Sequence, residues 1–303
     1  MSRARLLLLC PGQGDQHAGM FDLARTNPAA SALIDRLLNM QPPTGEDIFA
    51  NRTAQPLIVT ATLGMWQAIR DFAPQPALVA GYSIGELSAY GVAGAFTPEQ
   101  AVTLATQRAQ WMDDCQQAAP GQALVSITGL TLANAGKLAS TYGYHISIET
   151  GEDTCIAGGP GAQADHLLQA IEAAGARGKR LPVAVASHTP YMQGAVAPLA
   201  QAVRATAFQT MQAPVLAGID AAAVHDHERA VETLSRQLAE PIRWLACMDA
   251  VAEAGITVAL ELGPGGALSR MLQNRHPHIA TRSVADFRTL DGIRKWLERA
   301  AEN

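Results

Sequence analysis

The most restrictive feature of the chain is a Gly-x-Ser-x-Gly pattern at residues 81–85, with Ser83 at its centre. Residues 77–81 form a short apolar stretch that predicts a buried strand, and residues 86–93 after the serine have helical spacing. Glycines on both sides let the backbone turn sharply from strand to helix, which pushes the serine oxygen out above the sheet. An ordinary strand-to-helix turn also favours Gly and Ser, so a purely structural role stays open. In this context the pattern predicts an α/β fold with Ser83 at the end of a strand.

The same alternation of strands and helices recurs along most of the chain. Residues 6–10 are apolar and are followed at once by Pro11-Gly12, which is typical of a buried parallel strand entering a tight loop. The alternation predicts one large domain built on a parallel sheet. We expect helices at 57–72, 190–206, 228–239, 244–254 and 290–301, strands at 257–262 and 279–284, and a helix end with a linker at 112–121.

Residues 123–186 have a different order of elements, which is βαββαβ. This order is the ferredoxin-like plan. It predicts a small domain at 123–186, inserted into a large domain made of residues 1–122 and 187–303. The expected elements are strand 123–128, helix 132–142, strand 144–148, strand 153–157, helix 162–174 and strand 180–185.

Composition and charge limit the class of protein. The chain has 303 residues, of which 48% are hydrophobic and 16% charged, so it can bury an ample core. Its net charge of −5 offers nucleic acid or an anionic membrane no long-range attraction, and we expect neither as a partner. The apolar run at 6–10 is shorter than a secretion signal core of roughly 7–15 residues, and no run reaches the ~18 residues of a membrane span. We therefore expect a cytoplasmic protein.

The four cysteines are far apart in the sequence and include no Cys-x-x-Cys pair. Their neighbours are apolar, which is typical of small core residues and not of disulfides or metal ligands. They are Cys10, Cys115, Cys155 and Cys247.

A serine nucleophile needs a base, because its hydroxyl reacts poorly near neutral pH. Among eight histidines, His188 lies where a predicted strand ends and a predicted helix begins. Catalytic groups of α/β folds are common at that place. Taken alone, His188 is equally well explained as a structural cap. The other histidines belong to polar surface stretches or to the small domain, and they are His17, His145, His166, His225, His227, His276 and His278.

Short motifs along the whole chain occur in one order. They are Pro11-Gly12-Gln13-Gly14-Asp15-Gln16, Thr53-Ala54-Gln55-Pro56, the pattern at 81–85 continuing into Glu86-Leu87-Ser88-Ala89, Gln107-Arg108, Ser187-His188, Gln237-Leu238 with Pro241-Ile242-Arg243-Trp244, and Glu261-Leu262-Gly263-Pro264-Gly265. With this set the chain resembles the malonyl-CoA:acyl carrier protein transacylases over nearly its whole length. The ordered set is far more specific than Gly-x-Ser-x-Gly alone. The resemblance implies an α/β-hydrolase-like large domain.

The resemblance also implies roles for single residues. Ser83 would be acylated, and His188 would take its proton and later deprotonate an incoming thiol. Gln237 would steady His188, a task that an Asp performs in many hydrolases. The backbone amides of Gln13 and Ile84 would form an oxyanion hole.

Arg108 would bind the free carboxylate of a malonyl group. Acetyl groups would be selected against, because they leave a buried guanidinium unpaired. Without the resemblance, Arg108 is more simply explained as a solvated helix residue. Arg108 also distinguishes malonyl transfer from the activity of a serine esterase or lipase, which is an alternative function. A lipase has no use for a cation beside its acyl pocket.

Two places depart from the pattern of the resembled family. The residue before the nucleophile is usually His in that family and is Tyr82 here. Where the family commonly carries asparagines near the pocket, this chain has Ser147-Ile148-Glu149-Thr150. With a tyrosine before the nucleophile in a free-standing chain of this length, the sequence resembles the epsilon subunit of malonate decarboxylase. That subunit loads a carrier subunit that bears a modified dephospho-CoA group. Tyr82 is therefore a candidate substrate-binding residue.

The implied reaction is a ping-pong transfer of malonyl from malonyl-CoA to a carrier thiol. We expect no metal or organic cofactor, because the oxyanion hole, the base and the arginine would supply the required charge stabilisation. Coenzyme A and the phosphopantetheine-type arm of the carrier would be substrates. The implied partners are malonyl-CoA and an acyl carrier protein, foremost the malonate decarboxylase carrier. The alternatives are a malonyltransferase of fatty-acid or polyketide synthesis, and a non-catalytic docking subunit that takes up no acyl group.

Overall fold

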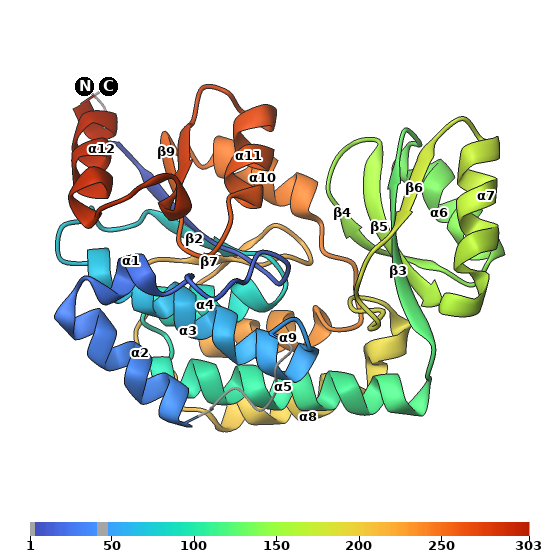
Figure 1. Ribbon diagram of the computed structural model, residues 1–303, viewed down its shortest axis with the longest axis horizontal. Helices are drawn as coiled ribbons and strands as arrows, with labels where there is room; N and C mark the ends of the chain where they lie inside the picture. Colours follow the sequence, from blue (N-terminus) through green and yellow to red (C-terminus); the bar gives the residue numbers. More distant parts are fainter. Residues whose placement is uncertain (1–3, 41–47, 303) are drawn as a thin grey trace.

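The computed structural model describes residues 4–40 and 48–302 and contains two β-sheets (Figure 1). The larger sheet has six strands in the order β10-β9-β1-β2-β7-β8, and the smaller has four in the order β4-β5-β3-β6. Residues 1–3, 41–47 and 303 of the expected large domain lie outside the described residues.

The larger sheet is parallel except at one edge. Strands β10, β9, β1, β2 and β7 pair in parallel, and β8 pairs antiparallel with β7. This confirms the predicted parallel α/β sheet. Because parallel strands end at the same edge, the loops after β1, β2 and β9 meet there. The strands are β1 (Leu6–Cys10), β2 (Leu78–Gly81), β7 (Val215–Leu216), β8 (Ala223–Val224), β9 (Val258–Glu261) and β10 (Ala280–Ser283).

Helices cover both faces of the larger sheet, and local signals set where several of them begin. Thr97 accepts a hydrogen bond from the backbone of Gln100 in a capping box, and Asp226 accepts one from Arg229, so each caps a helix. No described helix is both long and apolar enough to span a membrane. The helices are α1 (Asp22–Arg25), α2 (Pro28–Met40), α3 (Asn51–Ile69), α4 (Ile84–Val92), α5 (Pro98–Ala118), α8 (Gln193–Ala205), α9 (His227–Arg236), α10 (Trp244–Glu253), α11 (Ala267–Arg275) and α12 (Leu290–Glu302), with single 3₁₀ turns at Pro190–Met192 and Val284–Asp286.

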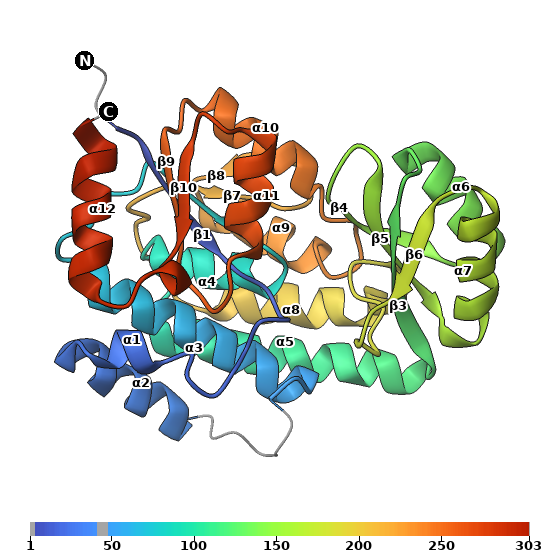
Figure 2. The same cartoon turned by 45° about the horizontal axis from the view of Figure 1, so that its top comes forward.

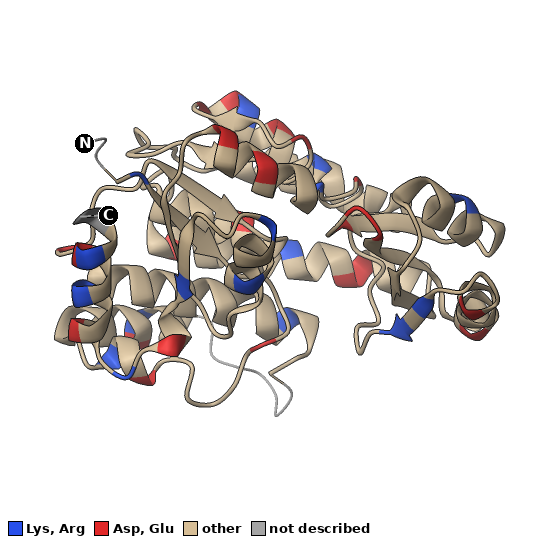
Figure 3. Cartoon of the chain, turned by 90° about the horizontal axis from the view of Figure 1, so that it is seen from above, with Lys and Arg blue, Asp and Glu red and all other residues tan. Residues whose placement is uncertain are grey.

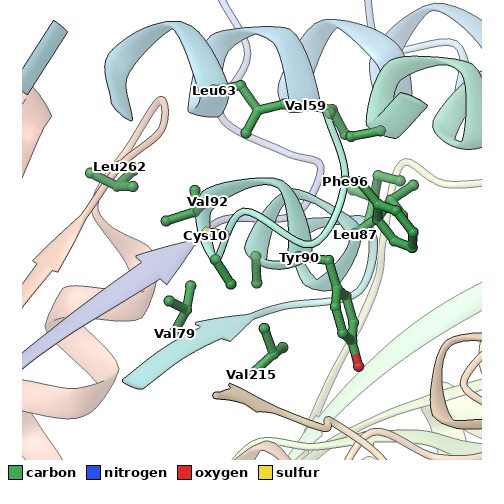
Figure 4. Packing of buried hydrophobic residues seen from close by; sticks show 14 of the residues in the cluster. Cys10, Val59, Leu63, Val79, Leu87, Tyr90, Val92, Phe96, Val215 and Leu262 are labelled. Atoms are coloured by element: carbon green, nitrogen blue, oxygen red, sulfur yellow. The ribbon is translucent and has the colours of Figure 1, made fainter. Parts of the chain in front are cut away.

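The residues of β1 show how the sheet is buried. All five are buried, as expected for a strand covered on both faces. Leu6, Leu8 and Cys10 belong to the core shared with α2, α3, α4 and α5, which Figure 4 shows from close by. Leu7 and Leu9 pack on the opposite face with α10 and α11. The alternation shows that the sheet is the middle of three layers, with helices packed on both faces.

The smaller sheet is antiparallel and has the ferredoxin-like strand order that the sequence predicts. Its helices cover one face through a separate apolar cluster that includes Val125, Ile127, Leu167 and Ile171. The elements are β3 (Gln122–Thr128), α6 (Leu132–Thr141), β4 (His145–Glu149), β5 (Thr154–Pro160), a 3₁₀ turn at Gly161–Gln163, α7 (Ala164–Ala173) and β6 (Arg177–Arg180).

The last strand of the smaller sheet lies earlier in the sequence than predicted. We expected it at 180–185, where the residues are apolar, but β6 occupies Arg177–Arg180 and pairs with β3. All four residues of β6 are exposed, so no apolar alternation marks the strand. A charged edge also resists pairing with the edge of another sheet. In the view of Figure 3, segments with Lys or Arg and segments with Asp or Glu are interspersed over the elements of both sheets.

Several elements of the larger region were not predicted at all. Strands β7 and β8 have two residues each, too few for a period to show. Helices α1, α2 and α11 were also missed. The predicted helix at 57–72 begins earlier, at Asn51, because the chain runs in helical form through Pro56.

The two sheets are joined through β4, the strand of the smaller sheet nearest the larger one (Figure 2). The backbone N–H of Ile242 donates to the carbonyl of Ser147 at 2.9 Å, and that of Glu149 donates to the carbonyl of Ile242 at 2.8 Å. Ile242 follows α9 in the larger region. The smaller sheet is therefore held against the segment that links α9 to α10.

Candidate active site

Ser83 lies between the end of β2 and the start of α4, as predicted. Its backbone has φ 55° and ψ −119°, a conformation that costs a non-glycine residue about 1–3 kcal/mol. A Cβ atom on Gly81 would lie 2.2 Å from the backbone of Gly85, and one on Gly85 would lie 2.1 Å from the carbonyl oxygen of Cys10. Only glycine fits at either place, which explains the pattern. The serine hydroxyl therefore projects at the carboxyl edge of the larger sheet.

His188 forms a hydrogen bond with this serine, with its Nε2 atom 2.8 Å from the Ser83 Oγ atom. The imidazole is buried, and the His188 backbone is also left-handed, with φ 60°. Its N–H donates to the carbonyl of Leu238 at 2.8 Å, and the carbonyl of Ser187 accepts from the Ser147 hydroxyl at 2.7 Å. The base is thus held from both the larger and the smaller region.

The contacts of the His188 ring define its tautomer. Its Nδ1 atom lies 2.5 Å from the backbone carbonyl oxygen of Gln237. A carbonyl only accepts, so Nδ1 carries the proton and Nε2 is free to accept the proton of Ser83. Burial, followed by the positive charge of Arg108, lowers the pKa of His188 to about 3, against the opposing effect of the bond to Gln237. The imidazole is therefore neutral near pH 7, as a general base must be.

Gln237 contacts His188, but through its backbone and not through its side chain. We predicted a helix at 228–239, whereas α9 ends at Arg236 and Gln237 is its C-cap. Carbonyl groups in the last turn of a helix lack partners within the helix. The carbonyl of Gln237 is therefore available to the imidazole, and its side-chain amide is left for other contacts.

Arg108 on α5 is only 3% exposed and points at the nucleophile. Its Nη1 atom donates to Gln55 Oε1 at 2.7 Å, and its Nη2 atom lies 3.3 Å from Gln237 Oε1 and 3.4 Å from Ser83 Oγ. Burial lowers the pKa of Arg108 to about 10, so the group stays charged at neutral pH. No carboxylate of the described residues pairs with it directly. A buried cation with neutral partners beside a nucleophile is suited to an acyl group that carries its own negative charge.

The two segments predicted to form the oxyanion hole touch each other. Ile84 is the first residue of α4, where the backbone N–H groups have no partner within the helix. Gln13 lies in the loop after β1, and that loop packs against the turn: the Tyr82 N–H donates to the carbonyl of Cys10 at 3.0 Å, and a Cβ atom on Gly12 would lie 2.8 Å from the Tyr82 carbonyl oxygen. The binding of an oxyanion by these two amides stays a prediction.

Tyr82 packs its ring edge-on against Trp244, with the centroids 5.2 Å apart. Burial raises the pKa of its phenol well above the ordinary value, so the ring is neutral. Glu149, the other unusual residue, ends β4 and contacts Ile242 through its backbone. Tyr82 therefore lies beside the start of α10, and Glu149 lies beside the segment that joins α9 to α10.

Two buried polar residues of the site were missed as site residues, although both lie in quoted motifs. Gln55 on α3 accepts from Arg108, and Glu86 on α4 accepts from the Gln237 side chain at 2.5 Å. Both are fully buried. A polar residue within an apolar helical stretch is the signal that could have found them.

The cysteines form neither disulfides nor a metal site within the described residues. The four cysteines are free thiols, and three of them, Cys10, Cys155 and Cys247, are buried as predicted for core residues, whereas Cys115 is only partly buried. Within residues 4–40 and 48–302, no group of three or more His, Cys, Asp and Glu could hold a metal ion. A hydroxyl, a neutral imidazole and a buried guanidinium are arranged for nucleophilic attack on an acyl group.

Comparisons with known proteins agree with this arrangement. The family described as the acyl transferase domain matches residues 7–286. The malonyl CoA-acyl carrier protein transacylase of Mycobacterium bovis is 30% identical over 307 residues, covering 95% of this chain and 99% of the relative. A solved structure of the transacylase from Coxiella burnetii has a TM-score of 0.90 at 25% identity, covering 99% of this chain and 98% of that one. A chain of a solved complex between a type II PKS acyl-carrier protein and its malonyl-transacylase has a TM-score of 0.88 at 26% identity, covering 99% and 100%. This chain therefore belongs to the acyl transferase family and, within it, to the malonyl CoA-acyl carrier protein transacylases.

Proposed function

We propose that this enzyme moves a malonyl group from malonyl-CoA to the thiol of a carrier protein through an ester on Ser83. One observation carries the proposal: three groups from distant parts of the chain converge. The Ser83 hydroxyl lies 2.8 Å from the His188 imidazole and 3.4 Å from the Arg108 guanidinium.

In the first half-reaction, the Ser83 oxygen attacks the thioester carbonyl while its proton passes to the Nε2 atom of His188. The negative charge that develops on the carbonyl oxygen is stabilised by the backbone amides of Gln13 and Ile84. Collapse of the intermediate breaks the carbon–sulfur bond, and the leaving thiolate of coenzyme A takes the proton back from His188. The products are free coenzyme A and malonyl-Ser83.

In the second half-reaction, the thiol of the carrier gives its proton to His188 and attacks the ester carbonyl. The bond to the Ser83 oxygen breaks, and the proton on the imidazole returns to that oxygen. We propose that no metal or organic cofactor takes part, because the two backbone amides, the base and the guanidinium supply the charge stabilisation. Coenzyme A and the carrier arm are both substrates.

Arg108 gives the reaction its preference for malonyl over acetyl. A malonyl carboxylate gives the guanidinium a partner of opposite charge in place of its long contacts with the neutral groups of Gln237 and Ser83. An acetyl group leaves the guanidinium with neutral partners only, so it loses that stabilisation.

For the acceptor, we propose the carrier subunit of malonate decarboxylase. The support is Tyr82 before the nucleophile and Glu149 at the end of β4, where the transacylases of fatty-acid synthesis usually have other residues. Carriers of fatty-acid or polyketide synthesis are the alternative acceptors that the test must include.

The test is to incubate the protein with labelled malonyl-CoA or labelled acetyl-CoA and to locate the label by mass spectrometry. We expect label on Ser83 from malonyl-CoA and little from acetyl-CoA. The loaded protein is then offered a carrier with a dephospho-CoA-type arm and carriers with an ordinary phosphopantetheine arm, and faster discharge to the first supports the proposed acceptor.

Three results would contradict parts of this proposal. A protein that takes up no label is not an acyltransferase. Label that is lost to water as fast without a carrier as with one indicates an esterase. Equal or faster discharge to the ordinary carriers places the enzyme with the fatty-acid or polyketide transacylases.

A further inference from the structure

Glu86 is a buried carboxylic acid that the reaction described above does not use. It lies one helical turn after Ser83 on α4 and is fully buried. A carboxylate in such a place loses its hydration, and the loss must be offset by hydrogen bonds and by an opposite charge. Its contacts therefore show what holds it there.

One oxygen of Glu86 has two donors. Its Oε2 atom accepts from the backbone N–H of Gly218 at 2.9 Å and from the side-chain Nε2 of Gln237 at 2.5 Å. Its Oε1 atom is buried and has no partner among the described residues. The carboxylate is thus anchored on one side and directed at Gln237.

This contact fixes the orientation of the Gln237 amide. With Nε2 bonded to Glu86, the Oε1 atom of Gln237 faces Arg108 Nη2 at 3.3 Å. The reversed amide would place donor against donor at Arg108. The backbone carbonyl of the same residue accepts from His188 at 2.5 Å. One residue therefore contacts both the base and the cation, and Glu86 holds that residue.

The charges around Glu86 come from several elements. Arg108 on α5 is the cation whose charge lowers the Glu86 pKa, and Asp220 after β7 is an anion that raises it. Tyr90 on the same helix and Cys247 on α10 are neutral, because burial raises the pKa of each. Arg108 has no carboxylate in direct contact, so Glu86 is its counter-charge across the amide of Gln237.

We propose that Glu86 is a positioning residue that acts through Gln237 on both His188 and Arg108, and that it neutralises Arg108 until the malonyl carboxylate arrives. This inference rests on the proposed function. When the substrate carboxylate reaches Arg108, two negative charges share one cation. Glu86 then binds a proton from solvent, so malonyl binding takes up a proton that acetyl binding does not.

The proton uptake can be measured near neutral pH, because the pKa of Glu86 lies in that range. Burial raises the pKa of Glu86 to about 7, against two hydrogen bonds and the Arg108 charge, which lower it. At about pH 7.5 much of the group is ionised before substrate binds. A second anion raises its pKa further, so the proton is taken up on binding.

The first test measures proton uptake in the Ser83→Ala protein, which binds malonyl-CoA without reacting. Binding heats are recorded at about pH 7.5 in two buffers that differ in ionisation enthalpy, with acetyl-CoA as the matched ligand that lacks the carboxylate. We expect more proton uptake with malonyl-CoA than with acetyl-CoA, and no difference when Glu86→Gln is added. Equal uptake for the two ligands, or a difference that survives Glu86→Gln, overturns the counter-charge role.

The second test measures the single-turnover rate of Ser83 acylation by malonyl-CoA. We expect Glu86→Ala to lower the rate roughly 10- to 100-fold, because a hydrogen bond to a charged group is lost. Glu86→Gln keeps an oxygen that accepts from Gln237 and should recover most of the rate. Ser88→Ala is the matched control on the same helix, since it removes a buried hydroxyl that has no partner among the described residues.

A double mutant separates positioning from a general effect on the fold. Gln237→Ala keeps the backbone carbonyl that contacts His188 and removes only the amide. In that background, Glu86→Ala should change the rate by roughly twofold or less. The same loss in both backgrounds overturns the role of Gln237 as intermediary. A wild-type protein that is not acylated on Ser83 contradicts the proposed function instead, and the binding heats still decide the role of Glu86.

Discussion

The two sheets of the molecule contribute to the site in different ways. The larger sheet and its helices carry the nucleophile Ser83 and the cation Arg108. The smaller sheet supplies no reacting group, but it holds the backbone around His188: Gln122 Oε1 accepts from the N–H of Ala186 at 2.8 Å, and Ser147 donates to the carbonyl of Ser187 at 2.7 Å. The comparison indicates that the larger region carries the reacting groups, and that the smaller one helps to hold the backbone of the base, together with the carbonyls of Gln237 and Leu238.

The reacting groups should show the largest effects. Ser83→Ala should abolish acylation by malonyl-CoA, and His188→Ala should lower its rate roughly 10⁴- to 10⁶-fold, as for the members of a serine catalytic unit. The rate of label incorporation measures both. A His188→Ala protein that keeps most of the wild-type rate would show that another group is the base.

The cation of the larger region should show the next largest effect. Arg108→Ala should lower the preference for malonyl over acetyl roughly 100-fold, because the substrate carboxylate loses the buried cation that binds it. The ratio of kcat/KM values for the two thioesters measures it. Arg52→Ala is the control, since Arg52 is paired with Asp113 near the surface. An unchanged ratio in Arg108→Ala removes this account of selectivity.

The smaller sheet should show a moderate effect that depends on position. Ser147→Ala removes the bond to the residue before His188 and should lower the acylation rate roughly 10-fold. Ser126→Ala removes a similar bond within the smaller sheet, in which the hydroxyl of Ser126 on β3 donates to the carbonyl of Lys179 on β6 at 3.2 Å. Its rate should stay at the wild-type value. Equal losses in the two variants mean that the smaller sheet contributes stability alone.

The protonation of His188 should show the smallest change. Burial and Arg108 hold its folded-state pKa near 3, against about 6.5 in an unfolded chain. The ring nitrogen signals of His188 in NMR spectra should therefore change little between about pH 7.5 and pH 5. As the pH falls below about 6.5, the unfolded chain binds a proton that the folded protein does not, so His188 lowers the stability of the fold. A titration of these signals with its midpoint near pH 6.5 would contradict the buried environment of His188 beside Arg108.

The features that the sequence predicted correctly are those with local signals. The turn at Ser83 has glycines that no other residue can replace, and the elements of the smaller sheet from β3 to α7 have short apolar periods. The position of His188 after a predicted strand also gave a local signal, although only the resemblance favoured a base over a structural cap.

The features that the sequence did not predict depend on tertiary contacts. Gln237 contacts His188 through a carbonyl that is available because α9 ends at Arg236, and no pattern marks that end. Glu86 is buried beside Arg108 only after α4 and α5 have packed. The edge strand β6 is exposed and charged, so its place is set by pairing with β3 and not by its own residues.

The most direct test of the account is the structure of the acylated enzyme, from crystals soaked with malonyl-CoA. We predict an ester on the Ser83 oxygen, with the malonyl carboxylate in hydrogen-bond contact with the Arg108 guanidinium and the His188 Nε2 atom still beside the ester oxygen. An ester on another residue, or a carboxylate turned to solvent while Arg108 keeps its bonds to Gln55 and Gln237, would contradict it.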